Sequence, residues 1–109
     1  MQRSEPSGKP SVQLKWTDLA SNDLEKIEAH ITQANSPIVA INVVMKIIDS
    51  VHLILPDHPG TGRQGRLKKT RELVIDGVPF VAIYREQLGT NRVEILRFLH
   101  DSQHWPTAD

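Results

Sequence analysis

The chain has 109 residues, of which 39% are hydrophobic and 24% are charged, and this is the composition of one ordinary folded domain rather than of a disordered chain. The 13 Lys and Arg residues balance the 13 Asp and Glu residues, which argues against a protein that coats nucleic acid through its net charge. The absence of cysteine excludes a disulfide framework and a thiolate metal site, and it suits a reducing cytoplasm, where we expect the protein to act.

The sequence predicts one structured domain over residues 12–106, with a frayed end at 107–109. Residues 1–11 are polar and contain Pro6, Gly8 and Pro10, so we expect a flexible tail and no signal peptide. The domain then opens on Val12–Trp16, in which apolar and polar residues alternate as in a half-buried strand.

Two helices are predicted next. Thr17 can cap a first helix over Asp18–Ala34, whose apolar residues recur every three or four positions. Ser36 and Pro37 begin a second helix that runs to Leu55 and is apolar around most of its circumference. Polar residues interrupt this helix too often for a membrane span, so we expect it to be covered on two sides, by the first helix and by a sheet.

A three-stranded antiparallel meander is predicted after a linker rich in Pro and Gly. Its strands are Leu73–Ile75, Val78–Tyr84 and Val93–Leu99. Asp76-Gly77 predicts a two-residue type I′ turn between the first two of these strands. The expected fold class is therefore α+β, in the order β-α-α-β-β-β, with the helical hairpin packed on a small antiparallel sheet.

The charge is distributed unevenly along the chain. Residues 1–62 hold 5 basic and 7 acidic residues (−2), and residues 63–109 hold 8 and 6 (+2). The basic residues that gather before the strand at Leu73 are candidates for binding a target or a phosphate, although a solvated loop would also explain them. They are Arg63, Arg66, Lys68, Lys69 and Arg71.

The same region supplies candidate catalytic residues. Metal-free RNA cleavage needs acid–base groups and cations, and we expect a positive concavity in which such groups meet. Tyr84 is at least as well explained as a core residue. The candidates are Arg71, Tyr84, Arg85, Arg97 and His100.

Metal and cofactor sites are not expected. His100 and His104 lie four residues apart, but no H-E-x-x-H pattern accompanies them. The chain also has no phosphate-binding loop, no dinucleotide-binding glycine motif and no nucleophile elbow.

Several short motifs, in this order and spacing, resemble those of the RelE/ParE superfamily of bacterial toxins, over about residues 12–106. The motifs are Trp16, Ala20, Asp23-Leu24, Ile27, Pro59, Gly62-Arg63, Thr70-Arg71-Glu72-Leu73, Tyr84-Arg85, Val93-Glu94-Ile95-Leu96, Leu99-His100 and Trp105-Pro106. The resemblance implies a bacterial toxin of a type II toxin–antitoxin module, of the kind linked to plasmid stabilisation. It also implies a cognate antitoxin that wraps an extended segment around the toxin in a hetero-oligomer.

The superfamily divides by activity. RelE-like members cleave mRNA on the ribosome with basic residues and often a C-terminal tyrosine, whereas ParE-like members inhibit DNA gyrase. Here the middle strand reads Pro79-Phe80-Val81-Ala82, no tyrosine follows Trp105, and the second helix is long. The resemblance therefore favours gyrase inhibition without catalysis. A metal-independent mRNA endoribonuclease using Arg71, Arg85, Arg97 and His100 is the second hypothesis, and an inactive toxin fold that serves as an antitoxin-binding corepressor is the third.

Overall fold

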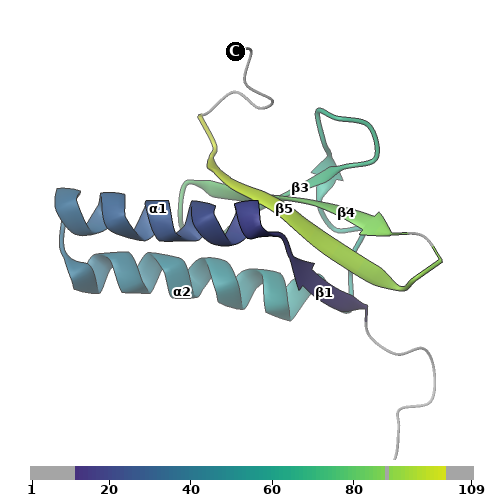
Figure 1. Cartoon of the computed structure of the whole chain (residues 1–109), viewed down its shortest axis with the longest axis horizontal. Helices are drawn as coiled ribbons and strands as arrows, with labels where there is room; N and C mark the ends of the chain where they lie inside the picture. The colour runs from purple at the N-terminus through teal and green to yellow at the C-terminus, as the bar shows by residue number, and fades with distance from the viewer. Residues whose placement is uncertain (1–11, 88, 103–109) are drawn as a thin grey trace, which may run out of the picture.

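Two helices and a five-stranded sheet make up the computed structural model, which describes residues 12–87 and 89–102 (Figure 1). The predictions for residues 1–11, for Trp105-Pro106 and for residues 107–109 lie outside these ranges. The elements are β1 (Gln13–Trp16), α1 (Asp18–Ala34), α2 (Pro37–Ile54), β2 (Arg63–Gln64), β3 (Arg71–Val74), β4 (Phe80–Gln87) and β5 (Arg92–His100).

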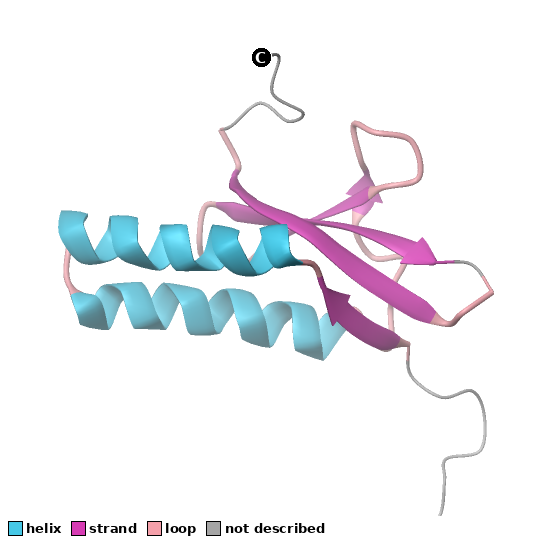
Figure 2. Cartoon of the chain, viewed as in Figure 1, coloured by secondary structure: helices cyan, strands magenta, loops and turns pink. Residues whose placement is uncertain are grey.

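The strands are ordered β1-β5-β4-β3-β2 across the sheet. Neighbouring strands are antiparallel except for β1, which pairs with β5 in parallel and places Leu14 beside Val93. The predicted α+β class and the helical hairpin are confirmed, and Figure 2 shows the two helices side by side against the strands. The sheet differs from the prediction in being mixed, and β2 is a two-residue strand within the stretch predicted to be a linker.

Both helices begin where their capping residues predict. The hydroxyl of Thr17 accepts a hydrogen bond from the backbone N–H of Ala20 at 3.2 Å, and that of Ser36 accepts one from Val39 at 3.2 Å. The bounds of α1 are those predicted. The second helix ends at Ile54 rather than Leu55, which is its C-terminal cap.

The core lies between the helices and the facing side of the sheet. Strand alternation sends Leu73, Ala82 and Ile95 to this side, where they meet Leu24 and Ile47 of the helices. The opposite side of the sheet holds a smaller buried cluster, formed by Val81, Ile83 and Leu99.

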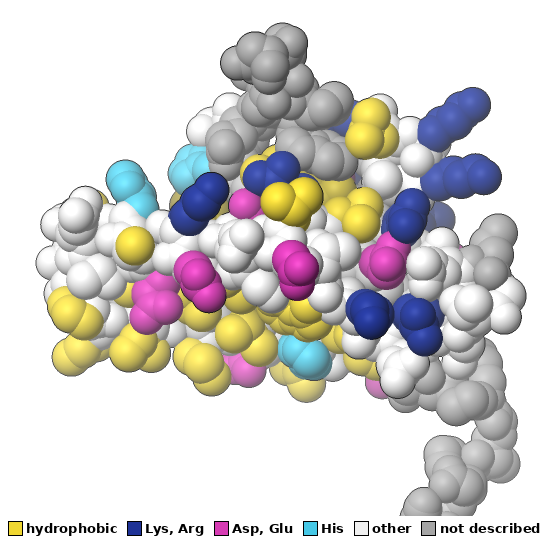
Figure 3. Space-filling model, in the orientation of Figure 1, with side chains coloured by type: hydrophobic (Ala, Val, Ile, Leu, Met, Phe, Trp, Pro, Cys, Tyr) yellow, Lys and Arg dark blue, Asp and Glu magenta, His cyan; other side chains and the backbone are white. Residues whose placement is uncertain are grey.

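The outer face of α2 is uncovered, so the expectation that this helix is enclosed on two sides is wrong. Ala40, Ile47 and Val51 are fully buried, but Ile38 is 72% exposed and Leu53 is 75% exposed. The end of the helical hairpin where α1 meets α2 projects beyond the strands (Figure 1), and apolar side chains gather along the lower margin of the molecule in Figure 3. Among the described helices, α2 is the one with enough length and apolar character to cross a membrane.

The turn between β3 and β4 is longer than the predicted type I′ turn. Ile75 accepts a hydrogen bond from Val78 N–H at 3.4 Å and donates one to the carbonyl oxygen of Phe80 at 3.0 Å, and the connection between the two strands comprises residues 75–79. Of its residues only Gly77 has a positive φ, of 86°, whereas a type I′ turn needs two. Pro79 has no N–H for a ladder and lies in this connection, where its carbonyl accepts from Asp101 N–H.

Candidate functional site: a basic groove beside strands β3 and β4

An open groove of about 930 Å³ lies where β4 continues beyond the start of β3. The pairing of these strands stops at Arg71 and Tyr84, whereas β5 accompanies β4 as far as Gln87 and Arg92. The connection before β3 and the β4–β5 hairpin therefore face each other across a step in the sheet. We call this hollow the basic groove, and it is lined by Gln64, Lys69, Thr70, Arg71, Arg85, Glu86, Gln87, Thr90 and Arg92.

The basic groove holds four cationic side chains and one carboxylate. The Arg71 guanidinium donates from Nη1 to the carbonyl oxygen of Gly62 at 2.9 Å, which fixes its position. Arg85 forms an ion pair at 2.7 Å with Glu94, which is not one of the residues that line the groove. Within the described residues, Arg92 Nε is the one buried side-chain nitrogen or oxygen that has no hydrogen-bond partner. Figure 3 shows Lys and Arg side chains projecting over this end of the sheet.

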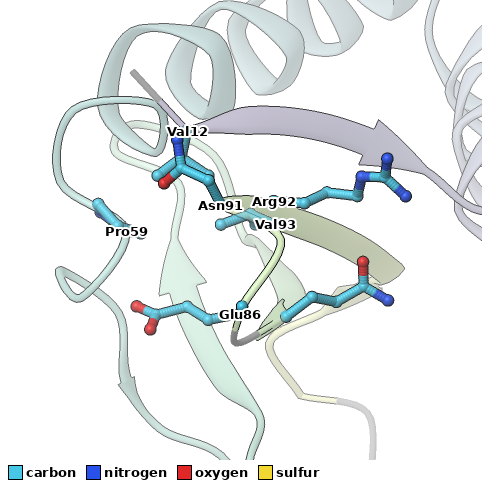
Figure 4. A pocket seen from close by; sticks show the side chains of 8 residues that line it. Val12, Pro59, Glu86, Asn91, Arg92 and Val93 are labelled. Atoms are coloured by element: carbon cyan, nitrogen blue, oxygen red, sulfur yellow. The ribbon is translucent and has the colours of Figure 1, made fainter. Parts of the chain in front are cut away.

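A second hollow, of about 410 Å³, lies beside the basic groove at the end of the same hairpin. Among its lining residues, Val12 lies beside Asn91, Pro59 lies to their left and Glu86 lies below them in Figure 4. Glu86, Gln87 and Arg92 line both hollows. The β4–β5 hairpin therefore separates the two hollows, and these three side chains border both of them.

Part of the predicted basic patch stabilises the framework instead of lining the groove. Arg63 and Arg66 each form an ion pair with Glu72, at 3.1 and 3.2 Å, and the Glu72 side chain is only 2% exposed. A carboxylate buried this deeply is costly unless cations and hydrogen bonds surround it. Lys68 is exposed and does not line the groove, so Lys69 and Arg71 are the members of the predicted patch that do.

Tyr84 is a core residue, which was one of the two explanations that the sequence offered for it. Its side chain is fully buried, and its hydroxyl donates to the carbonyl oxygen of Pro59 at 2.7 Å and accepts from Gly62 N–H at 2.8 Å. The hydroxyl therefore ties the connection after α2 to the sheet. Burial raises the pKa of Tyr84 above its ordinary value of 10.0, more than the hydrogen bond from Gly62 lowers it.

The ionisation of Tyr84 is expected to be coupled to unfolding. Because its pKa is raised in the folded state, its contribution to stability is complete below the unfolded value near pH 10 and is lost as the pH rises through the folded value. Tyr84 is the single tyrosine, so tyrosinate absorbance reports this residue alone. A titration of the native protein should have its midpoint above that of the protein in urea, and equal midpoints would contradict the burial of the hydroxyl. The Tyr84→Phe variant supplies the blank.

Arg97 and His100 lie away from the basic groove. Arg97 Nε and Nη2 donate to the two carboxylate oxygens of Asp23 at 2.7 and 3.0 Å, and this carboxylate raises the pKa of Arg97. Asp23 also accepts from Phe98 N–H at 3.0 Å, which closes the edge of β5 beyond the end of β1.

His100 lies at the far end of β5, opposite Phe80, where the two rings meet edge to face. Arg85 lies five positions after Phe80 in β4, which corresponds to about 16 Å at the rise of a strand. The structure therefore brings Lys69, Arg71 and Arg85 together at the basic groove, and it places Tyr84, Arg97 and His100 elsewhere.

Two residues were missed in the sequence. Arg92 directly follows the Gly89-Thr90-Asn91 turn, and hairpin pairing alone would have placed it beside Gln87 and two pairs from Arg85. From the sequence, Asp23 was noted within the Asp23-Leu24 motif and not as an acceptor, since helical periodicity does not show that a strand edge needs an acceptor there.

Metal ligands are not brought together in the part of the chain that the structure describes, where no group of three or more His, Asp or Glu side chains could hold an ion. His104, one member of the histidine pair noted in the sequence, lies outside the described residues.

Two helices over a mixed sheet, with the first strand parallel to the last, define a fold that is shared with known toxins. The toxin–antitoxin complex RelBE2 from Mycobacterium tuberculosis has this fold, with a TM-score of 0.55 at 18% identity over 90% of this chain and 100% of that chain. A chain of the chromosomal ParDE toxin–antitoxin system from P. aeruginosa is more similar, with a TM-score of 0.76 at 30% identity over 83% of this chain and 96% of that chain.

Sequence comparison identifies the family. The model described as "ParE toxin of type II toxin-antitoxin system, parDE" matches residues 14–105. A relative from Sinorhizobium fredii (strain NBRC 101917 / NGR234), named "Putative toxin Y4kP", is 39% identical over 93 residues, which cover 85% of this chain and 92% of the relative. The chain belongs to the ParE toxin family, and the predicted membership of the RelE/ParE superfamily, nearer its ParE branch, is confirmed.

Proposed function

We propose that this ParE-like toxin of a type II toxin–antitoxin system arrests growth by binding DNA gyrase in the bacterial cytoplasm, without catalysing a reaction of its own. Its partner is a cognate antitoxin, since the structural relatives come from toxin–antitoxin systems. The uncovered outer face of α2 and the outer edge of β1 are surfaces that a wrapping polypeptide can cover by helix packing and strand addition.

The observation that carries this proposal is the dispersal of the acid–base groups. An endoribonuclease needs a proton acceptor and a proton donor within hydrogen-bond reach of one phosphate, together with cations. Here the Tyr84 hydroxyl has both of its hydrogen-bonding roles occupied in the core, and His100 is about 16 Å along the sheet from the level of Arg85. The described residues thus offer cations and the Glu86 carboxylate at the groove, but neither the Tyr84 hydroxyl nor the His100 imidazole lies beside them, which supports inhibition by binding.

Purified toxin is expected to block supercoiling by gyrase and to increase the amount of cleaved DNA bound to the enzyme, and mixing with antitoxin should reverse both effects. The His100→Gln variant should inhibit gyrase as strongly as the natural chain does, because inhibition by binding needs no acid–base group at His100. Agarose-gel assays of supercoiling and cleavage measure both quantities.

Transcript mapping in induced cells provides the counter-test. Cuts within codons on the ribosome, together with their loss in the His100→Gln variant, would replace the proposal with the endoribonuclease hypothesis. Full growth on expression of the toxin alone, with antitoxin binding intact, would instead support a corepressor.

A further inference from the structure

We propose that the basic groove binds the phosphodiester backbone of DNA, so that the toxin grips the DNA that gyrase holds as well as the enzyme. This inference rests on the proposed gyrase function for the origin of the DNA. Binding of DNA by the groove depends only on the residues of the groove, so DNA binding and gyrase inhibition can be tested separately.

The first observation is the buried and unpaired nitrogen of Arg92. Buried charged donors are almost always hydrogen-bonded, because leaving one without a partner is costly. Arg92 Nε has no partner among the described residues, and Arg92 is one of the residues that line the basic groove. A guanidinium is a planar fork of donors whose geometry matches two phosphate oxygens. A phosphate in the groove would supply the missing acceptor once the Arg92 side chain turns to bring the buried Nε to the surface.

The second observation is the backbone of Lys69 on the opposite wall. Its φ is 66°, a left-handed conformation that is uncommon for any residue with a side chain. Three hydrogen bonds keep the loop in this shape: Gly65 N–H to Thr70 O at 2.8 Å, Thr70 N–H to Leu67 O at 3.2 Å, and Thr70 Oγ1 to Leu67 O at 2.7 Å. Glycine would adopt this conformation without strain. The presence of lysine at this strained position therefore points to a role for its side chain.

The electrostatics of the groove favour an anionic chain. Lys69, Arg71, Arg85 and Arg92 give it four positive charges against one negative charge on Glu86, and Arg85 is also paired with Glu94 beside the groove, in a protein whose formal net charge is zero. Its other lining residues, Gln64, Thr70, Gln87 and Thr90, are polar, so an apolar ligand would find little to pack against. An open, positively charged hollow between two walls suits a strip of backbone, and such contacts position a protein on DNA without reading its sequence.

The test measures binding of the intact toxin to a labelled DNA duplex of about 20 base pairs by fluorescence anisotropy over a range of salt concentrations. Arg92→Gln is expected to weaken binding roughly 10-fold and to lower the slope of log affinity against log salt by about 0.9, the value for one lost phosphate contact. Lys69→Gly should weaken binding similarly while its melting temperature stays equal or rises, because glycine relieves the strain. Lys26→Gln removes one exposed charge from α1 and should leave binding unchanged.

The outcomes separate the two proposals. Equal binding by the natural chain, Arg92→Gln and Lys69→Gly would overturn the groove, even if all three inhibit gyrase. Tighter binding to RNA of the same length would overturn the assignment to DNA. Groove-dependent DNA binding by a toxin that has no effect on gyrase would retain this inference and refute the gyrase function.

Discussion

Replacing Asp23 with alanine is expected to lower the free energy of unfolding by about 3 kcal/mol. The carboxylate is almost fully buried and accepts three hydrogen bonds, two from Arg97 and one from Phe98 N–H. Its removal leaves a partly buried guanidinium and an unpaired backbone donor at the edge of β5. Breaking one side of a buried ion pair is far more costly than losing an exposed one, which decides the size of the effect.

Urea denaturation measures this change, with a lower midpoint and an unaltered slope expected. Asp49→Ala is the matched control, because Asp49 is an exposed acid on α2 and its loss should change stability by less than about 0.5 kcal/mol. Similar losses in the two variants would show that the Asp23 cluster is no stronger than a surface contact. Because Arg97 contributes to the framework through Asp23, a loss of toxicity in Arg97 variants should be interpreted only alongside their stability.

Replacing Gly62 with valine is expected to destabilise the fold by about 3 kcal/mol. A Cβ atom at this position would lie 2.7 Å from the Tyr84 hydroxyl and 2.9 Å from the backbone oxygen of Glu72. The tyrosine side chain is fully buried, so we expect this clash to break or bend both hydrogen bonds of its hydroxyl. The carbonyl of Gly62 also holds Arg71, so the mouth of the basic groove should shift as well.

Gly60→Ala tests the same connection without the clash. No atom lies within 4 Å of a Cβ at Gly60, so this variant should be as stable as the natural chain or slightly more stable. Calorimetric melting of the two variants side by side gives the comparison. If the Gly62→Val and Gly60→Ala variants have the same melting temperature, the contact between this connection and Tyr84 does not stabilise the protein.

The helices could be predicted from the sequence because their signals are local. Thr17 and Ser36 are capping residues that mark where the two helices begin, and the spacing of apolar residues defines the inner face of each helix. The outer face of α2 could not be judged in this way, since apolar residues there indicate burial whether or not another layer is present. Only the positions of the other elements show that this face is left open.

The site was predicted in part for a similar reason. A run of basic residues was recognised as a unit, but successive residues of a strand point to opposite sides, so Arg71 and Glu72 separate in the fold. Glu72 then draws Arg63 and Arg66 to its own side, whereas Arg71 joins residues from the β4–β5 hairpin. Pairings between distant segments decided which charges became structural, and no local pattern encodes them.

The parallel pairing of β1 with β5 joins the first strand of the chain to the last, so the sheet can be completed only late in synthesis. Leu14 and Val93 are neighbours in the sheet although the ribosome joins them to the chain 79 residues apart. During translation β1 therefore has no strand partner until β5 has left the exit tunnel, and contacts of such long range form late in folding. We therefore expect the nascent chain to lack its complete sheet for most of its synthesis, which would give an antitoxin already in the cell time to capture the protein as it matures.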